Sequence, residues 1–171
     1  MLPETALRML RMLPDGLDFV LEAPCATWRE TASLRKRCAV PIIMDELAEL
    51  DGDIARIVAE DIADGIGLKI SKAGLTRGRR HRDICRAAGL TISVQDTVGS
   101  VIAFAGIVHL GATVPERNLR CILDCRDMVT LETAGFDAPV TRGGVLASSA
   151  PGLGITVRRE VLGEPVARWT D

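Results

Sequence analysis

Three charged residues end short apolar runs at nearly equal intervals along the chain. Glu22 ends the first run, Asp45 the second and Lys69 the third, which places them 23 and 24 residues apart. A buried strand that ends in a charge delivers that charge to the edge of its sheet, where a site can use it. Two carboxylates and an amine at one edge would form a charged site suited to acid–base chemistry.

Regular secondary structure at the same spacing is needed to bring these residues together. The apolar runs predict five strands, and helical periodicity or capping residues predict the helices between them. The predicted strands are 17–21, 40–44, 65–70, 90–94 and 119–123. The predicted helices are 5–13, 27–37 with a capping box of Thr27 and Glu30, one capped by Asp51 or Asp53, one after Thr76 that closes at Gly89, and 101–110.

Alternating strands and helices predict a parallel sheet covered by helices, either doubly wound or a (β/α)8 barrel. The fourth and fifth strands end at Gln95, Asp96 and Asp124, so polar residues follow every strand. A barrel gathers such ends into one ring, and no glycine-rich phosphate loop follows the first strand. These observations favour α/β architecture as a partial TIM-type barrel of about five strand–helix units. Residues 1–128 would form the C-terminal part of a barrel, and 129–171 a tail of short β pieces in the same domain.

Composition and charge exclude several other classes of protein. The chain has 171 residues, 47% of them hydrophobic, and a net charge of −2, which is typical of a globular domain without a nucleic-acid-binding patch. No apolar stretch is long enough to cross a bilayer, and no basic-then-apolar leader begins the sequence. Five scattered cysteines predict reduced thiols and a cytoplasmic location.

Several stretches resemble the C-terminal barrel domain of the enolase superfamily, in the mandelate racemase/muconate lactonising branch. They are Leu21-Glu22-Ala23-Pro24, Pro41-Ile42-Ile43-Met44-Asp45-Glu46 and Leu68-Lys69-Ile70-Ser71-Lys72-Ala73-Gly74-Leu75-Thr76. Ser93-Val94-Gln95-Asp96-Thr97-Val98-Gly99-Ser100, Pro115-Glu116-Arg117-Asn118-Leu119-Arg120 and Pro151-Gly152-Leu153-Gly154-Ile155 are similar to the cis-3-hydroxy-L-proline dehydratase group.

The resemblance implies that a Mg²⁺ ion binds the carboxylate of a small substrate while a lysine removes the proton next to it. It implies Glu22 and Asp45 as metal ligands and Lys69 as the catalytic acid–base residue. Burial and the nearby cation are expected to lower the pKa of that lysine. Glu46 would support the ligands. The substrate would be contacted by Gln95, Asp96 and Asp124.

Two departures from the family pattern accompany these expectations. A third carboxylate ligand, a second lysine and a capping domain are expected upstream of Met1. The family usually has two glycines where this chain has only Gly74, which puts the placement of the following helix in question. Lys72 is interpreted as a solvated loop lysine and His109 as a packed core residue. Arg77, Arg79, Arg80 and Arg82 are interpreted as a solvated helix face.

The expected function is Mg²⁺-dependent dehydration of cis-3-hydroxy-L-proline or a close analogue. Two alternatives remain open, namely racemisation or 2-epimerisation of a proline-type amino acid and a fragment without turnover. The expected partners are a small carboxylate or imino acid, with neither nucleic acid nor membrane. Because a partial barrel leaves sheet edges and apolar inner faces uncovered, self-association is also expected.

Overall fold

A five-stranded parallel sheet forms the centre of the computed structural model, which describes residues 1–97, 99–138, 140–141 and 143–169. The strands are β1 (Leu21–Glu22), β2 (Ile42–Met44), β3 (Gly65–Lys69), β4 (Thr91–Gln95) and β5 (Leu119–Ile122). They lie in the order β1-β2-β3-β4-β5, and each pairs in parallel with the next. The predicted parallel α/β sheet of five strand–helix units is therefore confirmed.

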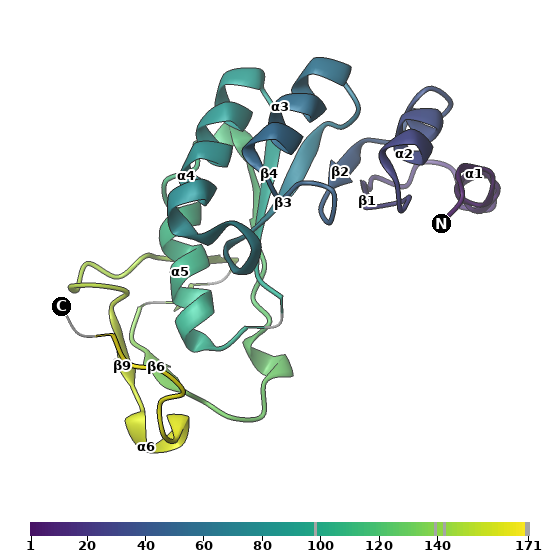
Figure 1. Ribbon diagram of the computed structural model, residues 1–171. Helices are drawn as coiled ribbons and strands as arrows, with labels where there is room; N and C mark the ends of the chain where they lie inside the picture. Colours follow the sequence, from purple (N-terminus) through teal and green to yellow (C-terminus); the bar gives the residue numbers. More distant parts are fainter. Residues whose placement is uncertain (98, 139, 142, 170–171) are drawn as a thin grey trace.

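Within the described part of the chain, one helix precedes β1, four others connect the successive strands, and these helices cover one face of the sheet. They are α1 (Pro3–Arg11), α2 (Trp28–Arg35), α3 (Asp51–Glu60), α4 (Ile70–Ala88) and α5 (Val101–Gly111). Figure 1 shows α3, α4 and α5 beside β3 and β4, with α1 and α2 near β1 and β2. Among the described residues, no helix is both long and apolar enough to cross a membrane.

The two faces of the sheet carry different kinds of side chain. Large aliphatic side chains lie on the helix-covered face, where Ile66, Leu68, Ile92 and Val94 are almost completely buried. The opposite face carries small or polar residues at the intervening positions: Gly65, Gly67, Lys69, Thr91, Ser93 and Gln95. At β3 and β4 the inner face is therefore not apolar, and the main hydrophobic core lies between the sheet and its helices.

The strand predicted over 17–21 is shorter than expected and begins only at Leu21. β1 is an edge strand whose described partner is the three-residue strand β2, through Leu21↔Ile42 and Glu22↔Ile43. Apolar composition alone does not make a strand, because each residue also needs a backbone partner. Leu17 is correspondingly 53% exposed.

Local capping decides where α2 and α3 begin. At α2, the Thr27 hydroxyl accepts from the Glu30 backbone amide at 3.3 Å and the Glu30 carboxylate accepts from the Thr27 amide at 3.1 Å. The predicted capping box is confirmed. At α3, neither predicted aspartate is the N-cap, which is Leu50. Asp53 instead accepts from the Leu50 amide at 2.8 Å from inside the first turn.

Helix α4 starts at Ile70, directly after β3, whereas the predicted helix began only after Thr76. Gly74 interrupts it with φ 64° and ψ 172°, so residues 70–73 form a separate turn ahead of the main helix. A positive φ is readily adopted only by glycine, which explains the residue at this break. The predicted C-cap Gly89 ends the helix at φ 75°.

The C-terminal segment contains two small antiparallel pairs, β6 (Ala134–Phe136) with β9 (Ile155–Val157) and β7 (Val140–Thr141) with β8 (Gly144–Val145). It also contains the 3₁₀ turn η2 (Arg126–Met128) and α6 (Arg159–Leu162), and η1 (Glu116–Asn118) precedes β5. Phe136 packs edge-on against Phe104 of α5 with ring centroids 5.1 Å apart. His109 of α5 lies 3.1 Å from the Leu153 carbonyl and is only half-buried, so it contacts this segment and is not the core residue expected. The domain boundary at 128 stays a prediction.

A completely buried histidine, His81, connects α3 to α4, and its surroundings predict that stability depends on pH. His81 lies 3.0 Å from an Asp51 oxygen, and Arg80 also pairs with Asp51, at 2.9 Å, so part of the predicted solvated arginine face is engaged. Burial lowers the pKa of His81 below its ordinary value of 6.5, assisted by Arg77 and Arg80, and the attraction of Asp51 does not overcome it. The unfolded chain then takes up a proton that the folded chain does not.

The free energy of unfolding should therefore fall as the pH is lowered from about 7.5 to about 5.5, by at most about 1.4 kcal/mol per pH unit for one proton. His81→Gln should reduce this slope in urea-unfolding series at several pH values. The matched control is His109→Gln, at the other of the two histidines in the chain. An unchanged slope in His81→Gln would contradict the assignment.

Candidate active site

Asp45 is the centre of a buried charge cluster at the carboxyl end of the sheet. Its side chain is 5% exposed, and each of its two oxygens is bound by a different lysine. Lys69 Nζ lies 2.5 Å from Oδ2, and Lys72 Nζ lies 2.7 Å from Oδ1. The structure thus brings together two of the residues predicted for the site and adds a third that was assigned to solvent.

The positions of these three residues follow from the parallel sheet. Asp45 comes directly after β2, and Lys69 is the last residue of the neighbouring strand β3. Adjacent parallel strands end at the same edge, so residues one repeat apart become neighbours. Lys72 lies on the turn ahead of Gly74, which begins immediately after β3 and folds back over the strand end.

The ion pairs shift the pKa values of both partners. Burial raises the pKa of Asp45, but hydrogen bonds from Lys69 and Lys72 outweigh it and leave the pKa lowered. Burial lowers the pKa of Lys69, but the hydrogen bond to Asp45 and the negative charges of Asp45, Glu46 and Glu22 leave it raised. Burial alone therefore does not lower the pKa of Lys69 in this arrangement, and the lowering expected beside a bound cation stays a prediction.

Glu22 and Gln95 form the second contact of the site. Gln95 Nε2 donates to Glu22 Oε1 at 2.8 Å, across the two intervening strands β2 and β3. Strands three places apart would lie about 14 Å from each other in a flat sheet. A direct hydrogen bond over that span favours a sheet curled toward its polar face, as in a barrel wall.

Gly67 leaves room for both contacts. A Cβ atom at this position would lie 3.3 Å from Asp45 Oδ1 and 3.3 Å from Gln95 Nε2. The glycine on β3 therefore creates a cradle between the carboxylate from β2 and the amide from β4. Its position in the middle of a strand, where glycine is otherwise unfavourable, is explained by this close approach.

The remaining predicted site residues lie at the same edge in different surroundings. Glu46 follows Asp45 and is near enough to affect Lys69 electrostatically. Asp96 has one buried oxygen with no hydrogen-bond partner among the described residues. Asp124 is bound by the Arg126 guanidinium, at 2.9 and 2.7 Å, and is not among the contacts of Asp45.

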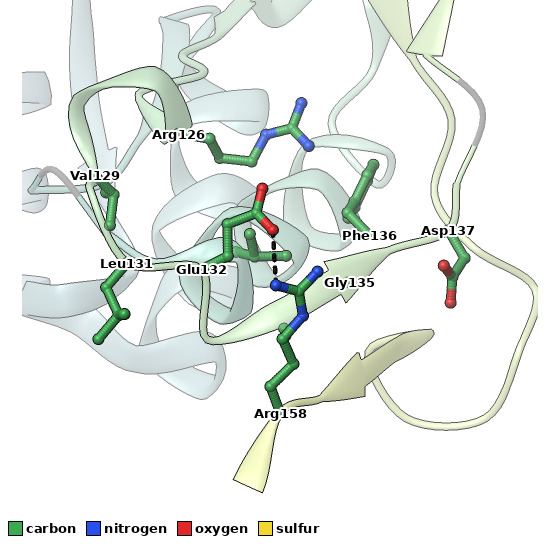
Figure 2. Close-up of a pocket in the computed structure, with 10 residues that line it drawn as sticks. Arg126, Val129, Leu131, Glu132, Gly135, Phe136, Asp137 and Arg158 are labelled. Atoms are coloured by element: carbon green, nitrogen blue, oxygen red, sulfur yellow. Dashed lines mark ion pairs between the residues drawn. The ribbon is translucent and has the colours of Figure 1, made fainter. Parts of the chain in front are cut away.

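Arg126 was not predicted, and it also lines the pocket drawn in Figure 2. Its guanidinium lies 4.1 Å from the ring centroid of Phe104 and 5.0 Å from that of Phe136. The pocket of about 380 Å³ lies between η2, α5 and β6, and Figure 2 shows Glu132 facing Arg158 across it in a 3.0 Å ion pair. Because Arg126 and Arg158 are each paired with an acid, the pocket offers no unpaired arginine for an anionic ligand.

A second pocket of about 350 Å³ adjoins Asp45 itself. It is lined mainly by apolar side chains with Asp45 and Glu46 at one side: Met1, Ala23, Cys25, Ala26, Met44 and Leu47 complete the wall. A small molecule seated there would place an apolar surface against the wall and a polar group against the carboxylates. This pocket, and not the larger one, adjoins the charge cluster.

The residues at this edge have the donor chemistry that Mg²⁺ requires. Glu22 and Asp45 supply hard carboxylate oxygens from neighbouring strands, and the two ammonium groups on Asp45 show that the position attracts positive charge. Within the described ranges, no cluster of three or more Asp, Glu, His or Cys residues is present. The chain therefore supplies two carboxylates, Glu22 and Asp45, of the kind that would hold the metal.

Comparison with known proteins identifies the family. The family model described as enolase C-terminal domain-like matches residues 1–161. The chain therefore belongs to the enolase C-terminal domain-like family, whose structurally similar members are TIM-barrel proteins.

Two curated relatives illustrate the level of similarity. The chain is 39% identical over 157 residues to a cis-3-hydroxy-L-proline dehydratase of Roseibium aggregatum, covering 91% of this chain and 43% of the relative. It is 34% identical over 119 residues to an o-succinylbenzoate synthase of Thermobifida fusca, covering 69% of this chain and 37% of the relative. The chain thus spans less than half the length of these relatives.

Solved structures agree with this placement. A mandelate racemase/muconate lactonizing enzyme from Aspergillus oryzae superposes with a TM-score of 0.93 at 63% identity, covering 97% of this chain and 46% of that one. A mandelate racemase/muconate lactonizing enzyme from Roseovarius nubinhibens, complexed with magnesium, gives 0.93 at 54% identity, covering 98% and 46%.

Proposed function

We propose that this chain carries half of a Mg²⁺-dependent active site that removes the proton α to a carboxylate and then eliminates water from cis-3-hydroxy-L-proline or a close analogue. The observation that carries this proposal is the buried contact between Asp45 and Lys69 at adjacent strand ends. Relatedness to a cis-3-hydroxy-L-proline dehydratase supports the substrate class.

The residues on this chain divide the chemistry between them. When bound, Mg²⁺ supplies positive charge that stabilises the second negative charge formed on the substrate carboxylate. Glu22 and Asp45 would hold the ion, and Glu46 would adjust the local charge. Lys69 exchanges the α-proton and acts as a base only after it has lost its proton and its bond to Asp45.

Substrate contacts are proposed from the ends of the later strands. Gln95 holds Glu22 in place and lies close enough to the cradle at Gly67 to donate to a polar substrate atom. Asp96 has a buried oxygen available for a donor. Asp124, which is paired with Arg126, would contact the substrate at the outer edge of the site. The five free cysteines support a cytoplasmic location for this chemistry.

Proton NMR in D₂O tests the proposal. The 171-residue protein is incubated with Mg²⁺ and cis-3-hydroxy-L-proline, beside Lys69→Met and the matched variant Lys36→Met at an exposed lysine. Loss of substrate signal with formation of a dehydrated product, absent in Lys69→Met only, would support the dehydratase. Retained substrate with an exchanged α-hydrogen would indicate epimerisation instead. No exchange in any sample would indicate a fragment without turnover.

Self-association is proposed from the sheet edges. In the described residues, β1 pairs only with β2 and β5 only with β4, so both leave backbone donors and acceptors unpaired on one side. We expect light scattering to give a mass of at least two chains at micromolar concentration. A monodisperse monomer with a sharp thermal transition would contradict this expectation.

A further inference from the structure

We propose that Lys72 guards the metal site: it occupies Asp45 when no divalent cation is bound and leaves when one binds, so that it sets the affinity of the site. This inference rests on the proposed metal site at Asp45. It assigns a role to a lysine that the sequence alone places in solvent.

A divalent cation could bind Asp45 only if one of the two lysines that already contact it moved away. Both oxygens are already engaged, Oδ2 by Lys69 and Oδ1 by Lys72, and the carboxylate is almost completely buried. A divalent cation that used Asp45 would lie within a few ångströms of two ammonium groups. Like charges at such distances repel strongly in a buried setting, so at least one lysine must move.

The backbone indicates that Lys72 is the one that moves. Lys69 belongs to β3 and pairs with Gln95 in the sheet, which holds its backbone in place. Lys72 lies on the separate turn 70–73, which ends at the non-helical Gly74. A Cβ added at Gly74 would meet nothing within 4 Å, so there is free space around this hinge.

One side-chain contact connects the turn to the next strand end. Ser71 Oγ lies 3.1 Å from Thr97 Oγ1, and both residues are exposed. A single exposed hydrogen bond contributes on the order of 1 kcal/mol. Because Ile70 and Ala73 of the turn also pack against the hydrophobic core, the movement is assigned to the Lys72 side chain and the adjoining Gly74, and not to the whole turn.

Position 72 holds a lysine, although most basic residues of this chain are arginines. Of 21 basic residues only three are lysines, Lys36, Lys69 and Lys72, and two of them converge on Asp45. An ammonium on a flexible stem releases a carboxylate more readily than a guanidinium, which binds with two parallel hydrogen bonds. A lysine at position 72 neutralises the charge of Asp45, and a divalent cation can still displace it.

Metal binding by a series of variants tests the inference. Calorimetric titration with Mg²⁺ and Mn²⁺ is carried out on the wild type, Lys72→Met, Lys72→Arg, Lys36→Met and Asp45→Asn, each checked for folding by circular dichroism. Removing a competitor that occupies the site most of the time should tighten binding about tenfold in Lys72→Met. Lys72→Arg should bind more weakly than the wild type, and Lys36→Met should match it.

The wild-type protein supplies a second readout that needs no substitution. Lysine ¹⁵Nζ NMR should give three side-chain signals, and Mg²⁺ should shift that of Lys72 while that of Lys36 stays in place. Equal affinity in Lys72→Met and Lys36→Met, or an unmoved Lys72 signal, would overturn the guarding role. If Asp45→Asn binds metal as the wild type does, or if no variant binds metal, the proposed metal site fails and the guarding role fails with it.

Discussion

Asp45→Asn is expected to weaken divalent-metal binding strongly and to lower the free energy of unfolding by about 3 kcal/mol. The substitution keeps the shape of the side chain but removes the negative charge between two ammonium groups that are only 14% and 16% exposed. Breaking a buried ion pair leaves its partners uncompensated, which is why the effect exceeds that of a surface pair. Metal affinity should fall at least about a hundredfold, the upper end of losses found when residues around a metal site are changed.

Asp124→Asn is the matched control for this prediction. Asp124 also pairs with a basic residue at 2.7 Å, but its side chain is 45% exposed. Solvent screens such a pair, so the expected loss of stability is at most about 1 kcal/mol. Urea unfolding and metal titration of both variants make the comparison. Equal losses of stability would mean that burial of the Asp45 cluster has no energetic consequence, and retained metal binding in Asp45→Asn would exclude Asp45 as a ligand.

Gly65→Ala should destabilise the sheet by about 3 kcal/mol through overpacking. An added Cβ would collide with the hydroxyl oxygen of Thr91 and lie 2.5 Å from the Thr91 carbonyl oxygen and 2.8 Å from Ile43 Cδ1. The carbonyl belongs to the backbone of the adjacent strand β4, so the clash cannot be relieved by rotating a side chain. The strands would have to separate, and the carboxyl ends that carry Lys69 and Gln95 would shift with them.

Gly52→Ala is the control for the same chemical change. Gly52 lies in the first turn of α3, and an added Cβ there meets nothing within 4 Å. Because alanine loses less backbone entropy than glycine on folding, this variant should be more stable by about 0.5 kcal/mol. Thermal and urea unfolding should therefore move in opposite directions for the two variants. A stable Gly65→Ala protein would show that the polar face of the sheet is not closely packed.

The sequence predicted the architecture because the strand–helix repeat is a local property of the chain. Apolar runs about 25 residues apart, ended by Glu22, Asp45 and Lys69, were enough to predict a parallel sheet with charges at one edge. The capping box at Thr27 and the C-cap at Gly89 also depend on neighbours within a few residues, and both are confirmed. Strand length was harder to predict, since the extent of β1 depends on its partner and not on its own composition.

The contacts within the site were decided by tertiary structure. Lys72 reaches Asp45 only because α4 begins directly after β3 and breaks at Gly74, a geometry that the single glycine in the sequence did not reveal. Gln95 reaches Glu22 only because the sheet curls and Gly67 leaves the space between them clear.

The sequence by itself determined which charges reach one edge of the sheet, because the two-residue alternation of a strand and the repeat of the units are encoded along the chain. Only the tertiary structure decided which of those charges touch, how deeply they are buried and in which direction the pKa of Lys69 moves. Those properties depend on distances between residues far apart in sequence. Asp45 is accordingly predictable as a site residue, whereas its pairing with two lysines is a property of the folded chain.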